Sequence, residues 1–348
     1  MNALSPISDL TVVRAGPEDE PRIEAFLAAQ SGATPFHRPA WLRAILRGCG
    51  QESYMLVAEA FGTVTGYLPL THVRSRLFGS ALVSSGFAVG GGILASDPVS
   101  AARLAAAAEA LAGELGCPGV ELRGGALPEG WRRSVGTYAN FARDLPAAGS
   151  GDEAILKAIP RKQRAEVRRA MTFGLDVEVG RDTQPHYRVY SESVRNLGTP
   201  VFPRALFQAA LDEYGDDADI LTIYKGSQPV ASVLSLYHGG TVYPYWGGGT
   251  AEARGLRASE LMYYELMRHA AARGCTRFDF GRSKLGTGAF AFKKNWGFEP
   301  EPLVYASRGP ARDTNPLSAK YRLQVALWKK LPLGLANALG PQIARGLG

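Results

Sequence analysis

The amino-acid sequence predicts two similar α/β domains, each with a mixed β-sheet, followed by a helical tail. Three observations lead to this expectation: a strand–turn–strand pattern, a glycine triplet before a helical stretch, and a Gly-Cys pair before an apolar strand each occur twice, in the same order. At roughly 150 residues per domain, the 348 residues also allow two domains. The alternative is that the two halves share only the turn and helix-boundary residues that are common in α/β proteins.

Two segments have the pattern of β-hairpins. The first, YMLVAEAFGTVTGYLPLTHV (54–73), has a turn at Gly62 between two apolar runs. The second, DILTIYKGSQPVASVLSLYH (219–238), has its turn at Gly226. Apolar runs separated by a short glycine-containing turn are typical of antiparallel strand pairs.

A glycine triplet, a helix and a further strand follow each hairpin. The triplets are 90–92 and 247–249, and the returning strands lie in GCPGVEL (116–122) and GCTRFDF (274–280). A helix that connects two strands of one sheet joins parallel neighbours, so both sheets should be mixed. Apolar side chains recur at helical spacing in both helices: Ala101, Leu104, Ala108, Leu111 and Leu115 in the first, and Leu261, Met262, Leu266 and Ala270 in the second.

We expect domain boundaries near residues 150 and 312, which gives an N-terminal domain (1–150), a C-terminal domain (151–312) and a tail (313–348). Residues 152–173 are helical in character and should link the halves. Pro160 is typical of the first turn of a helix, and Gly174 is typical of the residue that follows a helix end.

The charge balance favours a partner that carries phosphate. Lys and Arg number 39 against 32 Asp and Glu, a net charge of +7 with a pI near 9.3. Three scattered cysteines are too few for a disulfide framework or zinc-type pairs, so we expect no metal site and a reducing compartment. No export signal begins the chain, and no apolar run reaches about 18 residues. We expect a cytoplasmic protein, with attachment to the inner membrane face left open.

A basic cluster at 161–169 is the first candidate binding site. It contains Arg161, Lys162, Arg164, Arg168 and Arg169, interrupted by Glu166. Arginine binds phosphate oxygens in a bidentate manner, so such a helix suits a diphosphate or an RNA backbone. A solvated helix face is the alternative.

The segment FDFGRSKLGTGAFAFKKNWGF (278–298) is the second candidate site. Asp279 stands at a strand end, Arg282 and Lys284 follow in a loop, and Lys293 and Lys294 lie on an expected short helix. Open α/β sheets bind ligands at the carboxyl ends of their strands. The segment is no phosphate-binding P-loop, because threonine occupies the position that requires lysine. Packing of its aromatic residues under the sheet is the alternative.

The triplet at 247–249 follows Tyr245 and Trp246, which could border a substrate channel; close backbone approach explains the glycines equally well. Dinucleotide-binding, zinc-protease and nucleophile-elbow motifs do not occur. The five histidines are scattered, so each is expected in a core or surface role.

Three passages resemble Fem-type peptidyltransferases: PRKQRAEVRRAMTFGLDVEV, the glycine triplet before a helix, and GTGAFAFKKNWGF. More narrowly they resemble FemAB-related proteins of PEP-CTERM and exosortase systems, in the group with BioF2-like acetyltransferase domains. The resemblance implies two tandem acyl-CoA N-acyltransferase (GNAT-like) domains. It also implies transfer of an acyl or aminoacyl group to an amine of a cell-envelope, peptidoglycan or exopolysaccharide precursor.

In Fem enzymes the donor is aminoacyl-tRNA and the acceptor carries a diphosphate. The resemblance places Phe292 and Lys293 at the donor end, where Lys293 would polarise the reacting carbonyl or hold phosphate, with Lys294 as a neighbour. Asp279 is the carboxylate best placed to accept a proton, so Lys293, Phe292 and Asp279 are the candidate catalytic residues. We expect no resident cofactor; the activated donor, aminoacyl-tRNA or acyl-CoA, is a co-substrate.

Acetyl-CoA-dependent relatives often carry Gln/Arg-x-x-Gly-x-Gly/Ala at a helix N-terminus. The most similar segment here is EARGLRAS (252–259), which has Glu252 at the first position of that motif and Arg257 at its last. This departure slightly favours a donor other than CoA, although Arg254 and Arg257 could still meet phosphates.

The expected partners are a phosphate-bearing small molecule or lipid-linked acceptor and tRNA, but no DNA. One alternative is a noncatalytic binding protein for a diphosphate-linked glycan precursor, and another is RNA binding as an end in itself. The tail aligns Leu323, Leu327 and Leu331 beside Lys329 and Lys330, which suits either packing on the domain or contact with a membrane interface.

Overall fold

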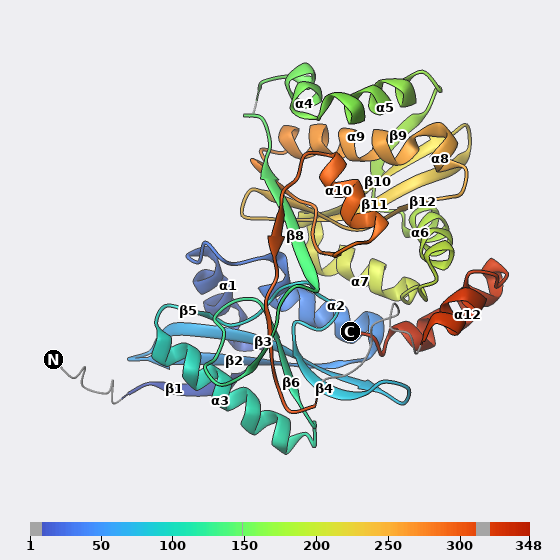
Figure 1. The fold of residues 1–348 in the computed structure, drawn as a ribbon. Coiled ribbons are helices and arrows are strands. Elements are labelled where there is room, and N and C mark those ends of the chain that lie inside the picture. The colour runs from blue at the N-terminus through green and yellow to red at the C-terminus, as the bar shows by residue number, and fades with distance from the viewer. Residues whose placement is uncertain (1–8, 148, 311–320) are drawn as a thin grey trace. The chain divides into compact units, whose positions relative to one another are not determined.

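The computed structural model describes residues 9–147, 149–310 and 321–348, which divide into two units with a sheet each (Figure 1). Among the described residues, unit 1 comprises 9–135, 304–310 and 345–348. Unit 2 comprises 136–147, 149–303 and 321–344. Each unit is therefore built from separate stretches of chain.

The sheet of unit 1 is mixed, because β4 and β6 are parallel and the other neighbours are antiparallel. The described strands follow the order β1 (Thr11–Ala15), β2 (Glu52–Ala60), β3 (Thr63–Ser75), β4 (Gly79–Ser84), β6 (Val120–Arg123), β16 (Tyr305–Arg308) and β7 (Arg132–Ser134), with β5 (Leu94–Ala95) on β3.

Helices cover both faces of this sheet, and the alternation of side chains along β2 shows how. Leu56 packs in a core cluster with Leu104 of α3 (Pro98–Glu114), whereas its neighbour Val57 packs with Ile23 of α1 (Glu20–Ala28). The remaining helices of the unit are η1 (Pro17–Asp19), η2 (Pro35–His37) and α2 (Pro39–Cys49).

The sheet of unit 2 repeats this plan. Strands β12 and β13 are parallel neighbours, joined by the crossover helix α9 (Ala258–Ala272). The described strand order is β14 (Ser283–Lys284), β8 (Tyr138–Asp144), β13 (Arg277–Asp279), β12 (Thr241–Gly249), β11 (Gln228–His238), β10 (Ala218–Lys225) and β9 (Asp176–Gly180), with β15 (Pro300–Pro302) on β8.

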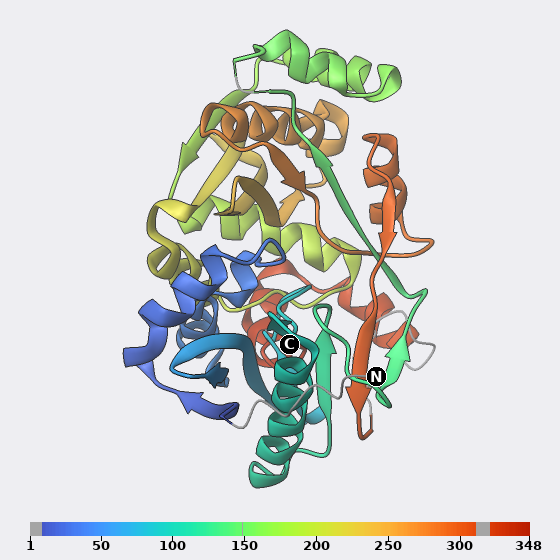
Figure 2. The ribbon, with the colours of Figure 1, turned by 90° about the vertical axis from the view of Figure 1, so that its left-hand side faces the viewer.

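Unit 2 is layered. Helix α9 lies on one face of the sheet, α6 (Thr183–Leu197) and α7 (Arg204–Tyr214) lie on the other, and α4 (Asp152–Ala158) and α5 (Arg161–Met171) pack on the outer side of α9 (Figure 2). Its other helices are η3 (Gly215–Asp217), α8 (Ala253–Leu256), α10 (Gly288–Asn295), α11 (Arg322–Trp328) and α12 (Leu333–Ala344).

The expected duplication is confirmed: each unit has a hairpin, a third strand, a crossover helix and a strand parallel to the third. The helical stretch at 152–173 differs from expectation, because it forms two helices. Ile159 has extended backbone (ψ 135°) and Pro160 stands immediately before α5. In the expected tail, residues 313–320 lie outside the described residues, and within 321–348 the chain forms α11 and α12.

Two strands belong to the sheet of the other unit from the one that a division at residue 150 suggests. Strand β8 pairs with β13, β14 and β15 of unit 2. Strand β16, from the later part of the chain, pairs instead with β6 and β7 of unit 1. Pairing between strands distant in sequence leaves no local signal, which is why the sequence did not indicate either exchange.

Candidate active site

The candidate site of unit 2 lies where β13 ends. Asp279 is the last residue of β13, a loop follows, and Thr287 begins α10 as its N-cap by accepting a hydrogen bond from the Phe290 N–H (3.3 Å). The Thr287 hydroxyl also donates to the Lys284 carbonyl oxygen (2.7 Å), which fixes the loop against the helix. This is the carboxyl edge of the parallel pair, as the sequence predicts.

Lys293 projects from α10 back to the loop. Its Nζ donates to the carbonyl oxygens of Gly281 (2.9 Å) and Arg282 (3.0 Å). The rings of Phe141 and Phe280 have their centroids 5.6 and 5.5 Å from Nζ. Burial lowers the pKa of Lys293 to about 7, although the Asp279 carboxylate opposes this shift. Near neutral pH the side chain is therefore divided between its ammonium and amine forms.

Asp279 is held in one orientation beside this lysine. Its Oδ1 accepts from the Gly281 N–H (2.8 Å) and its Oδ2 from the Asn140 amide (3.2 Å). Burial raises the pKa of Asp279, while these two donors and the positive charge of Lys293 oppose the rise. The carboxylate thus fixes the loop that contacts Lys293 and supplies a negative charge that acts on its ammonium.

Sequence reasoning missed the contribution of β8. This strand supplies Asn140, the Phe141 ring and Arg143, whose Nη1 donates to the carbonyl oxygens of Ala158 (3.2 Å) and Trp296 (3.2 Å). The motif YANFARD (138–144) has the alternation of a strand but no feature that indicates its partner. Only the strand pairing reveals that these residues surround the site.

The two candidate segments meet at the ends of their helices. Gly297, with φ +78°, follows α10, and a Cβ there would lie 2.9 Å from Cγ of Pro160. The start of α5, with Arg161 and Lys162, therefore adjoins the end of α10, with Lys294. All three of these cationic side chains are exposed.

Other members of the basic cluster have partners inside the protein. The Arg164 guanidinium donates to the carbonyl oxygens of Lys157 (2.9 Å) and Ile159 (3.0 Å), so it closes the end of α4. The Arg168 guanidinium lies 3.9 Å from the Glu153 carboxylate.

The start of α9 is occupied by an ion pair. Arg257, in the left-handed region at φ 54°, lies 2.7 Å from the Glu166 carboxylate of α5. Burial raises the pKa of Glu260 in the first turn of α9, and the negative charge of Glu166 adds to the rise. Arg254 is exposed on α8, the short helix that precedes Arg257.

The remaining predicted residues lie in different surroundings. The Arg282 guanidinium stacks 4.5 Å from the centroid of the Tyr138 ring, and Lys284 belongs to β14. Phe292 is half-buried, with its ring 5.8 Å from that of Tyr263.

The residues before the glycine triplet belong to β12. Trp246 is 3% exposed and packs edge-on against Phe207, while Tyr245 is half-buried on the strand. Close approach explains the triplet, because a Cβ on Gly248 would lie 2.5 Å from the Ser193 Cβ of α6.

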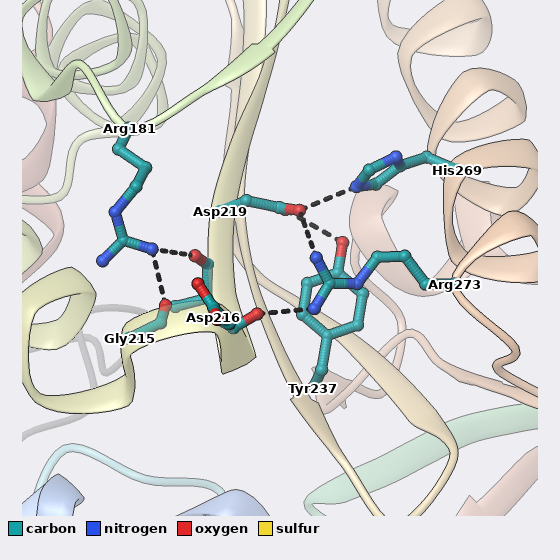
Figure 3. A network of polar contacts seen from close by, with 8 residues as sticks. Arg181, Gly215, Asp216, Asp219, Tyr237, His269 and Arg273 are labelled. Atoms are coloured by element: carbon teal, nitrogen blue, oxygen red, sulfur yellow. Dashed lines mark hydrogen bonds and ion pairs between the residues drawn. The ribbon is translucent and has the colours of Figure 1, made fainter.

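A second polar cluster lies at the opposite edge of the sheet, where β10, β12 and β13 begin (Figure 3). Buried Asp219 accepts hydrogen bonds from the Tyr237 hydroxyl (2.9 Å) and His269 Nε2 (2.7 Å), and Arg273 stacks 4.0 Å from the centroid of the Tyr237 ring. Arg273 also donates to the Asp216 carbonyl oxygen. This cluster fastens the end of α9 to β10 and β11, away from the carboxyl ends of the parallel strands.

Comparison with known protein families matches residues 157–294 to the acetyltransferase (GNAT) domain. The match includes α5, α9, the loop after β13 and Lys293 itself. These residues are a GNAT domain. The chain is accordingly an acyltransferase with a duplicated GNAT fold.

Solved structures agree on the fold. FemX has a TM-score of 0.64 at 14% identity, over 84% of this chain and 96% of that one. A tandem GNAT protein from the clavulanic acid biosynthesis pathway, solved without AcCoA, has a TM-score of 0.54 at 15% identity, over 87% of this chain and 100% of that one. The C-terminal domain of a putative lysylphosphatidylglycerol synthetase from Agrobacterium fabrum has a TM-score of 0.54 at 15% identity, over 84% of this chain and 92% of that one. A search of curated proteins by sequence found no match. The expected likeness to Fem-type tandem GNAT proteins is confirmed.

Proposed function

We propose that this GNAT protein transfers an aminoacyl or acyl group from an activated ester or thioester to an amine of a cell-envelope, peptidoglycan or exopolysaccharide precursor. The observation that carries the proposal is Lys293: a half-buried ammonium beside Asp279, held by two loop carbonyls at the carboxyl edge of a parallel strand pair.

In the reaction the amine nitrogen attacks the carbonyl carbon of the donor, so that a C–N bond forms and the C–O or C–S bond breaks. Negative charge develops on the carbonyl oxygen, and the proton lost by the amine leaves with the departing hydroxyl or thiol. An ammonium has three N–H donors, and the two loop carbonyls take two of those of Lys293. The third donates to the developing oxyanion.

Aminoacyl-tRNA is favoured over acyl-CoA as the donor. The carboxylates of Glu166 and Glu260 lie at the start of α9, and Arg257 there is engaged by Glu166. Negative charge at this helix end opposes a pyrophosphate. Arg161 and Lys162 instead offer exposed cations beside the end of α10, where phosphates of an RNA or a diphosphate acceptor can bind.

A lipid-linked acceptor is consistent with the name of one structural neighbour, a putative lysylphosphatidylglycerol synthetase, which names an aminoacylated lipid. The site residues proposed for donor and acceptor are Arg161, Lys162, Arg254, Arg282, Lys284, Lys294 and Tyr245, with Lys293, Phe292 and Asp279 at the reacting group.

The test is incubation of the protein with aminoacyl-tRNA or with acyl-CoA, each with a panel of amines that includes diphosphate-linked sugar–peptide precursors, followed by mass spectrometry. We expect a covalent mass increase on the amine with aminoacyl-tRNA, lost in Lys293→Ala. Lys225→Ala is the matched control, because Lys225 also donates to a backbone carbonyl of unit 2, that of Phe173, but on β10. Precursor binding without any transfer would contradict the proposal and favour a noncatalytic binding protein.

A further inference from the structure

The C-terminal helical pair, defined as α11 and α12, is attached to unit 2 along one side. The Arg195 guanidinium of α6 donates to the carbonyl oxygen of Lys329 (3.3 Å), and the Asn337 amide donates to the Ser191 hydroxyl (3.2 Å). Gly340 adjoins Val201 so closely that a Cβ would lie 3.0 Å from the Val201 nitrogen. These contacts fix which side of α12 faces the protein. On α11 that side carries Val325, because a Cβ on Gly198 would lie 2.5 Å from Val325 Cγ1.

The helical pair leaves four leucines exposed. Leu323 and Leu327 of α11 are 70% and 58% exposed, and Leu335 and Leu339 of α12 are 47% and 46% exposed. Each couple is four residues apart, so it forms a stripe along one side of its helix. Exposed leucines at successive turns of two adjacent helices mark an interaction surface.

The charge around these leucines has one sign. Arg322, Lys329 and Lys330 are exposed, and residues 321–348 contain no Asp or Glu. Leucine combined with lysine is not the composition of a protein interface, whose centre is depleted in lysine. It is the composition of helices that lie in the headgroup region of an anionic bilayer. Within the described residues no helix is long and apolar enough to cross a membrane.

We propose that the helical pair binds the surface of an anionic lipid bilayer. Leu323, Leu327, Leu335 and Leu339 enter the headgroup boundary, and Arg322, Lys329 and Lys330 lie at the lipid phosphates. The inference goes beyond the proposed acyl transfer, because it concerns where the protein resides and not what it does to an amine.

The experiment is sedimentation of the full chain with vesicles of phosphatidylcholine alone or of an equal mixture of phosphatidylcholine and phosphatidylglycerol. We expect binding to the mixed vesicles that weakens as salt is added. Replacing all four leucines with serine should lower the partition coefficient by at least about tenfold. Arg322→Glu with Lys330→Glu should lower it by about fivefold or more for each cation removed.

The matched controls replace residues of unit 1 that are as exposed as the substituted residues of the helical pair but lie far from them in the sequence. Leu77→Ser removes a leucine that is 68% exposed in unit 1, and Arg103→Glu with Arg133→Glu reverses two exposed cations. Both should bind as the unaltered protein does. Failure of the unaltered protein to bind mixed vesicles, or equal binding by the four-serine variant, overturns the proposal and leaves a protein partner as the occupant. Transfer to a water-soluble amine should be unchanged in that variant, so the two proposals can fail separately.

Discussion

The two units share a strand plan, but the residues that follow their matching strands differ. In unit 2, β13 ends at Asp279, and a loop follows before the helix that returns Lys293. In unit 1, β6 ends at Arg123, which pairs with Glu121 (2.7 Å) and donates to the Ala88 carbonyl oxygen (2.7 Å). Arg123 of unit 1 binds partners within its own unit, whereas Lys293 of unit 2 uses two of its three N–H donors and is proposed to offer the third to a substrate.

A groove of unit 1 extends this contrast. It encloses about 690 Å³ and is lined by alanines of α3, Leu127 and Trp131, with Asp97, Glu109 and Glu129 among its polar residues. Asp97 also caps α3 by accepting from the Ser100 N–H (2.8 Å), which removes a donor that a phosphate would need. An anionic donor therefore suits unit 2 and not this groove. The comparison teaches that duplication preserved the scaffold, while the proposed catalytic site lies in unit 2 alone among the described residues.

The largest expected effect is on turnover. Lys293→Ala should lower kcat by at least about tenfold and by up to about a thousandfold, because it removes a donor to the developing oxyanion. Thermal unfolding should stay close to that of the unaltered protein, and Lys225→Ala should retain full activity. Steady-state kinetics of both variants check this, and normal kcat in Lys293→Ala would remove the distinction between the units.

The corresponding change in unit 1 should affect stability instead. Arg123→Ala removes the ion pair with Glu121 and the hydrogen bond to the Ala88 carbonyl oxygen, which should lower the free energy of unfolding by about 2 kcal/mol. The exposed neighbour Arg133→Ala is the control and should change it by less than about 0.5 kcal/mol. Denaturant titration measures both; a loss of activity in Arg123→Ala without a loss of stability would contradict the account.

The sequence predicted the repeated plan well because each element is specified locally. The hairpins and the crossover helices follow from apolar periodicity and glycine turns. The site was predicted only in part. Lys293 and Asp279 belong to one recognisable segment, but Asn140 and Arg143 reach it through pairing of β8 with β13, and Glu166 reaches Arg257 through packing of α5 on α9. Contacts between distant segments leave no mark in a single sequence.

The glycine triplets offer a smaller test. Gly248→Ala should cost about 1 to 3 kcal/mol of unfolding free energy, because its Cβ would overlap Ser193. Combination with Ser193→Gly should cost less than the sum of the two changes in a double-mutant cycle. Gly255→Ala, where nothing lies within 4 Å, is the control. Additive costs would show that close approach is not the reason for this glycine.

The smallest expected effect concerns the exposed cations of α5. Arg161→Ala should weaken tRNA binding a few-fold and reduce the slope of log affinity against log salt by about one. Arg169→Ala, about 12 Å further along the same helix, should leave the slope unchanged. Filter binding over a range of salt distinguishes the two, and equal slopes in all three proteins would remove Arg161 from the donor site.

The pH dependence of transfer tests the role of Lys293 most directly. Because the pKa of Lys293 is lowered to about 7, its ammonium is lost as pH rises through that value. If the ammonium stabilises the oxyanion, kcat/KM should fall above pH 7 after allowance for ionisation of the amine. In Lys293→Arg, where the side chain stays charged, that decline should disappear while part of the activity remains. Identical pH profiles in the two proteins would contradict the account.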